Sequence, residues 1–309
     1  MRIRQVQRVL SLATSLTASL GTWLAVAPAV VEGQQKVDMR RATSPDVSVR
    51  MMGAFGSLKV IGWAKDSIVI TGVLPQGARM DGGFGGDPSS VSRGAKFYVE
   101  LPNDAPTNGG SLEMRVPLRA RVWVKAGSAT VDVSGVAGGV DVNIIGGSVR
   151  VASNPGELNI ESMDGAVVVE GSPTWMRVKT ATGDITVRGS SEDAAFTTVS
   201  GVVKVSDGRY ERARVETVTG SVVFAADLAR AGSLSVDSHS GPIELHVGAR
   251  PGVAVDATTV TGRIENSVSA RRPVPGREGR GEELGLEMGT GNARVTLRSF
   301  KGNIRLAFR

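Results

Sequence analysis

The sequence predicts an all-β protein built as a parallel β-solenoid, in which short strands coil and each coil stacks on its neighbour. Two patterns lead to this fold class. Glycines recur at spacings of 18 to 21 residues through the middle of the chain, and apolar residues keep fixed positions around each of them. The composition agrees, because a chain of 309 residues with 40 glycines and only 4% aromatic residues favours strands joined by many turns.

The glycines mark the corners of the repeat. In chain order they are Gly147, Gly165, Gly183, Gly201, Gly220, Gly241, Gly262 and Gly291. The first three spacings are 18 residues each, and the last is 29 residues, which we attribute to a loop insertion at residues 270–283. Weaker copies of the pattern surround Gly56, Gly127 and Gly302.

Four apolar columns accompany these corners, seven and five residues before each glycine and two and four residues after it. Around Gly183 they are filled by Met176, Val178, Ile185 and Val187. Only Asn266 places a polar side chain in any of the columns. Alternation with period 2 on both sides of a corner gives two short strands per coil, and coils stack about 4.8 Å apart. We expect right-handed coiling, the usual hand of parallel crossovers.

Residues 1–31 are expected to be a signal peptide. Arg2, Arg4 and Arg8 precede an uncharged run, Val9 to Val31, which ends in small residues with the A-x-A order of a cleavage site. The run is also long enough to span a membrane, so an uncleaved N-terminal anchor is the alternative, and it is the one membrane attachment that we expect. Either way we expect the protein to be exported, to the periplasm, the cell surface or the medium.

The rest of the chain divides into two regions. Residues 36–125 are expected to form a less regular β region that is continuous with the solenoid, and residues 126–309 hold the regular repeats. Lys301, Arg305 and Arg309 should cap the last coil with charge, which disfavours end-to-end stacking of separate molecules.

The composition excludes several kinds of site. The chain has no cysteine, which rules out disulfides, thiolate catalysis and cysteine-bound metals, and two histidines, His239 and His246, are too few for a histidine-based zinc site. The formal net charge of +6 falls to +3 without the three arginines of residues 1–31, and no basic run follows. We therefore expect no cofactor, no metal and no nucleic-acid partner.

Hydroxyl side chains flank the corners, three residues and one residue before each glycine, as Thr180 and Thr182 do before Gly183. Stacked hydroxyls could bind a ligand, but no His or Lys shares these columns to activate a nucleophile. We interpret them as structural groups that hydrogen-bond to the backbone of the corner, and we predict no catalytic residue.

The outward carboxylates are the other candidates for chemistry. Asp141 and Glu161 lie on neighbouring coils, two columns apart, as could suit a carbohydrate-active β-helix enzyme. Arg177, Lys179 and Arg214 are mixed with acids along the same face. We interpret this face as a solvated charged sheet and keep the enzyme as a second alternative.

The opposite outer face is more apolar in the middle of the solenoid. Val168, Val202 and Val223 point outward there, together with Thr186. We interpret these four residues as a candidate interaction surface for an envelope or surface protein, a glycan, or a second copy of the chain. Outward valines also suit strands for their own sake, which is the alternative explanation.

The repeats resemble a known family. The segment "GSLKVIGWAKDSIVITG" at residues 56–72, followed by "VKTATGDITVRG", "TVSGVVKVSDG" and "TVTGSVVFAAD", is similar to the putative adhesin family of bacterial envelope proteins. The resemblance covers roughly residues 45–309 and implies a fold like that of right-handed β-helices, surface adhesion, and no catalytic residue. We therefore expect an exported, non-enzymatic β-solenoid that presents a surface for adhesion or envelope interaction, with a self-assembling structural scaffold as the alternative.

Overall fold

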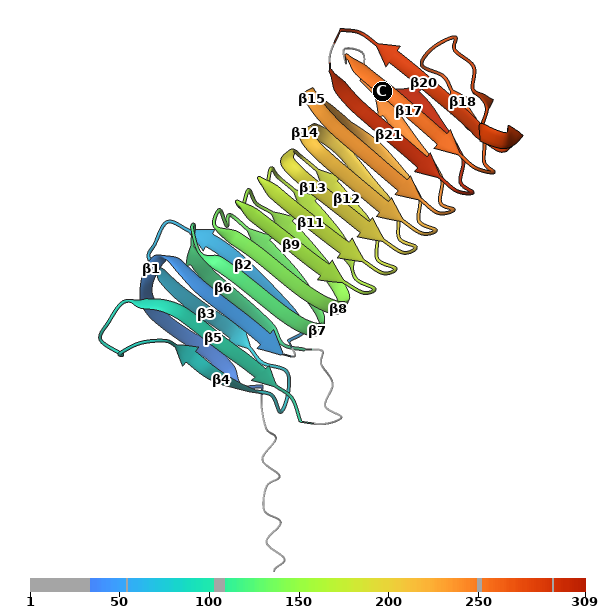
Figure 1. Cartoon of the computed structure of the whole chain (residues 1–309). Coiled ribbons are helices and arrows are strands. Elements are labelled where there is room, and N and C mark those ends of the chain that lie inside the picture. Colours follow the sequence, from blue (N-terminus) through green and yellow to red (C-terminus); the bar gives the residue numbers. More distant parts are fainter. Residues whose placement is uncertain (1–33, 54, 103–108, 249–251, 291) are drawn as a thin grey trace, which may run out of the picture. The chain divides into compact units, whose positions relative to one another are not determined.

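The computed structural model describes residues 34–53, 55–102, 109–248, 252–290 and 292–309 (Figure 1). They belong to one compact unit whose 22 strands form one hydrogen-bonded network, so the predicted all-β solenoid is confirmed. Among the described residues the one helical element is a 3-10 helix at Arg277–Gly279, and no helix there has the length and apolar character to cross a membrane. The expected signal peptide, residues 1–31, lies outside the described residues.

Each coil gives one strand to each of two layers, which we call the first and the second layer in chain order. In the middle of the chain the first layer contains β9 (Glu157–Ser162), β11 (Trp175–Thr180) and β13 (Ser191–Thr198), and the second contains β10 (Ala166–Glu170), β12 (Ile185–Arg188) and β16 (Ile243–Val247). From residue 121 on, four longer strands run through both layers: β7 (Arg121–Ser134), β8 (Gly139–Ala152), β14 (Val203–Thr217) and β15 (Val222–Ser238).

The core lies between the layers and is built from the four predicted columns. Met176, Val178, Ile185 and Val187 are all fully buried, and Val178 pairs in parallel register with equivalent residues of the coils on either side. The polar exception in these columns, Asn266, is only partly buried. Its amide group donates hydrogen bonds to the carbonyl oxygens of Ser269 and Arg271 and so organises the turn that follows.

The corner glycines are required by close stacking. A Cβ atom on Gly201 would lie 2.1 Å from the carbonyl oxygen of Gly183, and a Cβ on Gly183 would lie 2.2 Å from that of Gly165. Among the described glycines of this column only Gly147 has a left-handed backbone, with φ at 104°. The column is therefore kept free of side chains because each corner backbone packs directly on the next one.

The order of the coils at the C-terminal end differs from the prediction. The strands there are β17 (Val253–Thr259), β18 (Ile264–Asn266), β19 (Val274–Pro275), β20 (Glu282–Met288), β21 (Ala293–Ser299) and β22 (Ile304–Phe308). The last coil, β21 with β22, lies between the β15–β16 coil and the β17–β18 coil, as the order of β15, β21 and β17 in Figure 1 shows. Stacking in strict chain order was thus a wrong expectation.

The unit assigned to Gly291 is corrected as well. Gly291 itself lies outside the described residues, and β20 runs antiparallel to β17, so that Leu286 faces Val255 and Leu284 faces Ala257. The corner of the last coil is Gly302, whose Cβ would lie 2.1 Å from the carbonyl oxygen of Gly241. Period-2 alternation reads the same in both chain directions, which is why the sequence could not distinguish an antiparallel strand from another coil.

The expected loop at residues 270–283 is partly ordered, because β19 pairs with the start of β20 and the 3-10 helix lies between them. The basic residues of the last coil do not cap an edge. Arg305 lies between Glu244 and Glu265 of the two neighbouring coils, and Arg309 forms an ion pair with Asp227. Their charges instead help to fix the inserted coil in place.

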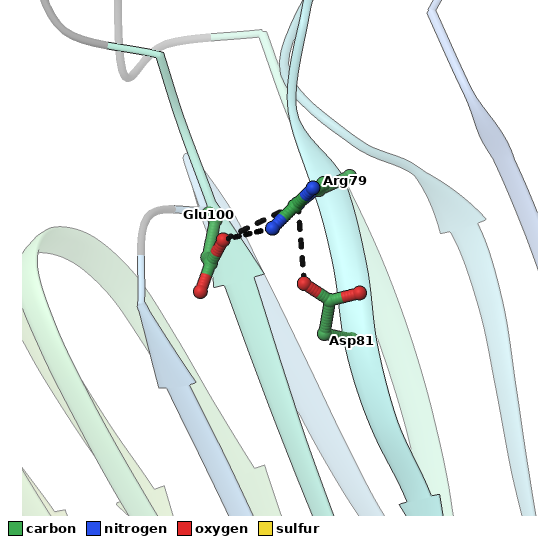
Figure 2. Close-up of polar contacts among 3 residues, drawn as sticks. All are labelled: Arg79, Asp81 and Glu100. Atoms are coloured by element: carbon green, nitrogen blue, oxygen red, sulfur yellow. Dashed lines mark hydrogen bonds and ion pairs between the residues drawn. The ribbon is translucent and has the colours of Figure 1, made fainter.

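The N-terminal region repeats this arrangement. Its strands are β1 (Lys36–Gly53), β2 (Ser57–Trp63), β3 (Ser67–Val73), β4 (Arg79–Phe84), β5 (Ser92–Glu100) and β6 (Ser111–Pro117). The first coil, formed by β1 and β2, lies between β7 and the β5–β6 coil, and β3 and β4 pair antiparallel with strands of that outer part. On β4, Arg79 binds Asp81 at 3.1 Å and Glu100 of β5 at 2.8 Å (Figure 2).

Candidate binding surfaces

The hydroxyl groups three residues before the corner glycines are used by the fold. The Thr180 hydroxyl donates a hydrogen bond of 2.6 Å to the carbonyl oxygen of Gly183, and the Thr198 hydroxyl accepts one of 3.0 Å from the backbone N–H of Gly201. Both threonines are buried. These contacts agree with the structural interpretation of the column, since each hydroxyl closes its own corner.

The four residues of the candidate interaction surface all lie on the outer face of the second layer. Val168 and Thr186 are direct neighbours in one column, but Lys204 stands between Thr186 and Val223. Val202 lies in the next column, where its backbone N–H donates to the Asp184 carboxylate at 2.8 Å. Two of the four residues, Val168 and Thr186, are therefore adjacent, and the charged side chain of Lys204 separates them from Val223.

A more continuous apolar surface lies at the corner itself, two residues before each glycine. We call it the corner ridge, and in the spatial order of the coils it consists of Ile145, Met163, Ala181, Val199, Val218, His239, Phe300 and Val260. Of the eleven exposed large apolar side chains in the described residues, six belong to this one row. Such a concentration is more than the scattered apolar exposure that a folded surface normally shows.

Backbone hydrogen bonds keep the corner ridge in line. The N–H of Thr182 donates to the carbonyl oxygen of Met163 at 2.9 Å, and that of Lys301 donates to His239 at 2.8 Å. The inserted last coil completes the row, because the Phe300 ring stacks on the His239 ring at 5.3 Å between centroids and 13° between planes. A shallow groove of about 540 Å³ runs beside this end of the ridge, past Glu216, Asp237 and Arg298.

The sequence carried a signal for the corner ridge. Seven of its eight positions are apolar, and all stand at one offset from the glycines. This offset lies outside the four core columns, so the core pattern by itself does not point to it. The place of Phe300 beside His239 could not be foreseen, because it depends on the insertion of the last coil.

A second candidate is a groove on the outer face of the first layer, which we call the tryptophan groove. It has a volume of about 660 Å³ and is bounded by Trp123 of β7 and Trp175 of β11. Asp141 of β8 and Asn159 of β9 line it between them. Gly139 lies in its lining, and a Cβ there would meet no atom closer than 3.7 Å, so the groove has room for a side chain at this point.

Polar groups in and beside the tryptophan groove are paired across neighbouring coils. The Asn159 amide donates to the Asp141 carboxylate at 3.2 Å, and the Asn143 amide donates to Glu161 at 3.1 Å. Burial raises the pKa of Asp141, and the nearby Glu161 carboxylate raises it further, against the opposing hydrogen bonds from Asn159 and Trp123. The two acids thus lie two columns apart, as expected, and each has an amide partner.

The two tryptophan rings are each flanked by an arginine. The guanidinium carbon of Arg177 lies 4.8 Å from the ring centroid of Trp175, and that of Arg50 lies 5.8 Å from the centroid of Trp123. This cation–π contact holds each flat side chain in a defined orientation.

The histidines lie apart from both acids. His239 belongs to the corner ridge, whereas His246 on β16 contacts Glu244 at 3.0 Å. In the part of the chain that the structure describes, no three histidine or acidic side chains come together as metal ligands would.

Comparison with known proteins identifies the family of this chain. It belongs to the Toastrack DUF4097 family, which matches residues 32–307. No curated protein matches it significantly. Among solved structures, a putative adhesin from Bacteroides fragilis is 9% identical with a TM-score of 0.42, covering 89% of this chain and 98% of its own. A putative lipid binding protein from Parabacteroides distasonis is 11% identical with a TM-score of 0.38, covering 87% and 96%. A putative cell adhesion protein from Clostridium sporogenes is 7% identical with a TM-score of 0.25, covering 89% and 100%.

Proposed function

We propose that this member of the Toastrack DUF4097 family is an exported, non-enzymatic binding protein of the cell envelope whose ligand is a neutral oligosaccharide held in the tryptophan groove. The observation that carries the proposal is the pair of tryptophans that bound one groove with hydrogen-bonding side chains between them. Export is supported by the basic and then apolar pattern of residues 1–31.

The chemistry of the tryptophan groove suits a sugar. The C–H face of a sugar ring packs on the apolar face of an indole, while its hydroxyl groups need donors and acceptors around the edge. Asp141 supplies acceptors, and Asn159 supplies both kinds of group. Acidic and basic side chains both line the groove, so no single sign of charge favours a charged ligand.

The size of the groove favours an oligosaccharide over a single sugar. Trp123 and Trp175 lie three coils apart in the first layer, which is about 14 Å at about 4.8 Å per coil. A ligand that touches both rings must span that distance. The stacked strands beneath keep the two rings at a fixed separation, so little ordering is needed on binding.

Binding without cleavage is favoured by the arrangement of the acids. A glycosidase needs two carboxylates that face each other across one glycosidic bond. Here Asp141 and Glu161 stand two columns apart on one open sheet face, and each is paired with an amide. The raised pKa of Asp141 is a feature that a carbohydrate-active enzyme would share, so cleavage of the sugar has to be measured together with binding.

The experiment is a titration of the purified protein with chitotetraose, cellotetraose and maltotetraose, each long enough to reach both tryptophans, followed by tryptophan fluorescence. We expect at least one of them to bind, and Trp123→Ala and Trp175→Ala each to weaken binding at least tenfold. Gly139→Leu should also abolish binding, because it fills the groove at a position where a Cβ fits. Trp63→Ala is the matched control, since Trp63 lies on β2 outside this groove and also packs against a cation.

Three results would count against the proposal. One is binding that survives both tryptophan substitutions and Gly139→Leu in proteins whose circular dichroism is unchanged. Another is release of shortened sugars during incubation, which would favour the enzyme instead. Failure of all three probes to bind would also count against a neutral oligosaccharide as the ligand.

A further inference from the structure

We propose that the corner ridge is the interface of a symmetric homodimer in which two solenoids pair with their ridges antiparallel. The proposal goes beyond the glycan site, because the corner ridge and the tryptophan groove are different surfaces made by different columns of the repeat. The second copy is identified by the pattern of charge on both sides of the ridge.

The corner ridge is a row on evenly spaced coils, and this limits how two copies can meet. Each coil places one ridge side chain about 4.8 Å from the next. Two such rows make contact over their full length only when they are parallel or antiparallel. A two-fold axis allows either arrangement, and it makes the two contacting surfaces identical.

Charged side chains flank the ridge in two columns. On the first-layer side, four residues before each corner glycine, the charged members in coil order are Glu161, Lys179, Glu216, Asp237 and Arg298. On the other side, one residue before the glycine, they are Asp164 and Lys301. The coil near one end of the ridge thus carries two acids, Glu161 and Asp164, and the coil near the other end carries two bases, Arg298 and Lys301.

The antiparallel arrangement makes these charges complementary. When the two-fold axis passes between the Val199 and Val218 coils, it brings Glu161 of one copy to Arg298 of the other. The same operation brings Lys179 to Asp237. The column on the second side follows the same rule, because Asp164 of one copy then faces Lys301 of the other.

Other arrangements bring like charges together. In the parallel pairing the two flanking columns exchange sides, so Glu161 meets Asp164 and Arg298 meets Lys301. An antiparallel pairing that slips by one coil brings Glu161 to Asp237, or Lys179 to Arg298. Like charges placed directly opposite each other are unfavourable, so the pattern selects one orientation and one register.

The side chains of the ridge fit the same register. Met163 meets Phe300, a sulfur–aromatic pair, and the small Ala181 meets the larger His239. Val199 and Val218 pack at the centre, where water is most easily excluded. The row is one side chain wide, so the interface is narrow, and we expect a dimer that dissociates on dilution.

The experiment is sedimentation velocity of the full chain, purified after export, over a hundredfold range of concentration. We expect a monomer–dimer equilibrium. Val199→Lys with Val218→Lys should weaken it at least tenfold. The matched control, Val202→Lys with Val223→Lys, places the same charges on the neighbouring outer face and should leave the equilibrium unchanged.

A charge reversal tests the orientation. Glu161→Arg alone should weaken the dimer, because it brings two arginines together, and Glu161→Arg with Arg298→Glu should restore it. A protein that stays monomeric throughout, or a dimer indifferent to the ridge lysines, would overturn the proposal. A double reversal that fails to restore the dimer, in variants with unchanged circular dichroism, would refute the antiparallel register. Sugar binding is not part of this readout, so the two proposals fail separately.

Discussion

The middle of the solenoid and its C-terminal end obey the same column rules but differ in how the coils are ordered. From β9 to β16 each coil stacks on the one before it in the chain. At the C-terminal end the last coil of the chain, β21 with β22, lies between the β15–β16 coil and the β17–β18 coil. The periodic pattern therefore sets the register within and between coils, but it leaves open which coil lies next to which.

The order at the ends is decided by features outside the repeat. At the C-terminal end β20 runs antiparallel along β17, and the Glu282 carboxylate accepts a hydrogen bond from the backbone N–H of Ile264 on β18. At the N-terminal end β4 has the corresponding outermost position (Figure 1), and its Arg79 forms ion pairs with Asp81 and Glu100 (Figure 2). Antiparallel strands and charged side chains make both edges unlike the coils, which opposes end-to-end growth.

The largest expected effect concerns the corners, which both regions share. Gly201→Ala in the middle and Gly302→Ala in the inserted coil should each lower the free energy of unfolding by about 3 kcal/mol or more, because the new Cβ would overlap a carbonyl oxygen. Gly127→Ala is the control, since nothing lies within 4 Å of a Cβ there. Urea denaturation measures all three, and a mild effect at Gly302 would contradict the inserted position of the last coil.

The next effect distinguishes the end from the middle. If the four core columns only required apolar side chains, Asn266→Val should stabilise the protein. We expect it to destabilise by about 1–2 kcal/mol, because the Asn266 amide holds the carbonyl oxygens of Ser269 and Arg271. Faster proteolysis between residues 267 and 281 should accompany the loss. In the middle of the solenoid, Val187→Asn should lower the free energy of unfolding by more than Asn266→Val does, since Val187 is fully buried.

The smallest effect concerns Asp141 and depends on pH. Its pKa is raised in the folded protein, so the folded state holds this proton more tightly than the unfolded state does. The stability that it contributes is present below the unfolded pKa of about 3.9 and is lost as pH rises through the folded value. Asp141→Asn should therefore be slightly more stable than the wild type at pH 7 and equal to it at pH 3. Urea denaturation of both proteins at pH 3 and pH 7 measures the difference in stability. An Asp141→Asn variant that is less stable than the wild type at pH 7 would contradict a raised pKa of Asp141.

Much of the fold could be predicted because its causes are local and periodic. Val178 and Ile185 are buried where alternation places them, and Thr180 closes its corner as a nearby hydroxyl should. The direction of β20 could not be predicted, because alternation is the same in both directions. The position of the last coil could not be predicted either, because every coil offers its neighbours the same edges.

The candidate surfaces were harder to find for a related reason. Trp123 and Trp175 lie far apart in the chain and in different columns, and only the stacking of four coils, those of β7, β8, β9 and β11, brings them to one groove. The corner ridge was visible as a column, yet its charge pattern becomes self-complementary only in the spatial order of the coils. Sequence reasoning in chain order would have placed Arg298 and Lys301 at the wrong distance from Glu161.

The most direct test of the coil order is a disulfide introduced into this cysteine-free chain. Ser235 pairs with Thr296, and Thr296 pairs with Asp256, all on the outer face of the first layer. Ser235→Cys with Thr296→Cys should oxidise readily, because neighbouring strands lie about 4.8 Å apart. Ser235→Cys with Asp256→Cys should not, because a strand lies between the two sulfurs. Non-reducing electrophoresis reads both, and cross-linking of the second pair without the first would contradict the inserted coil.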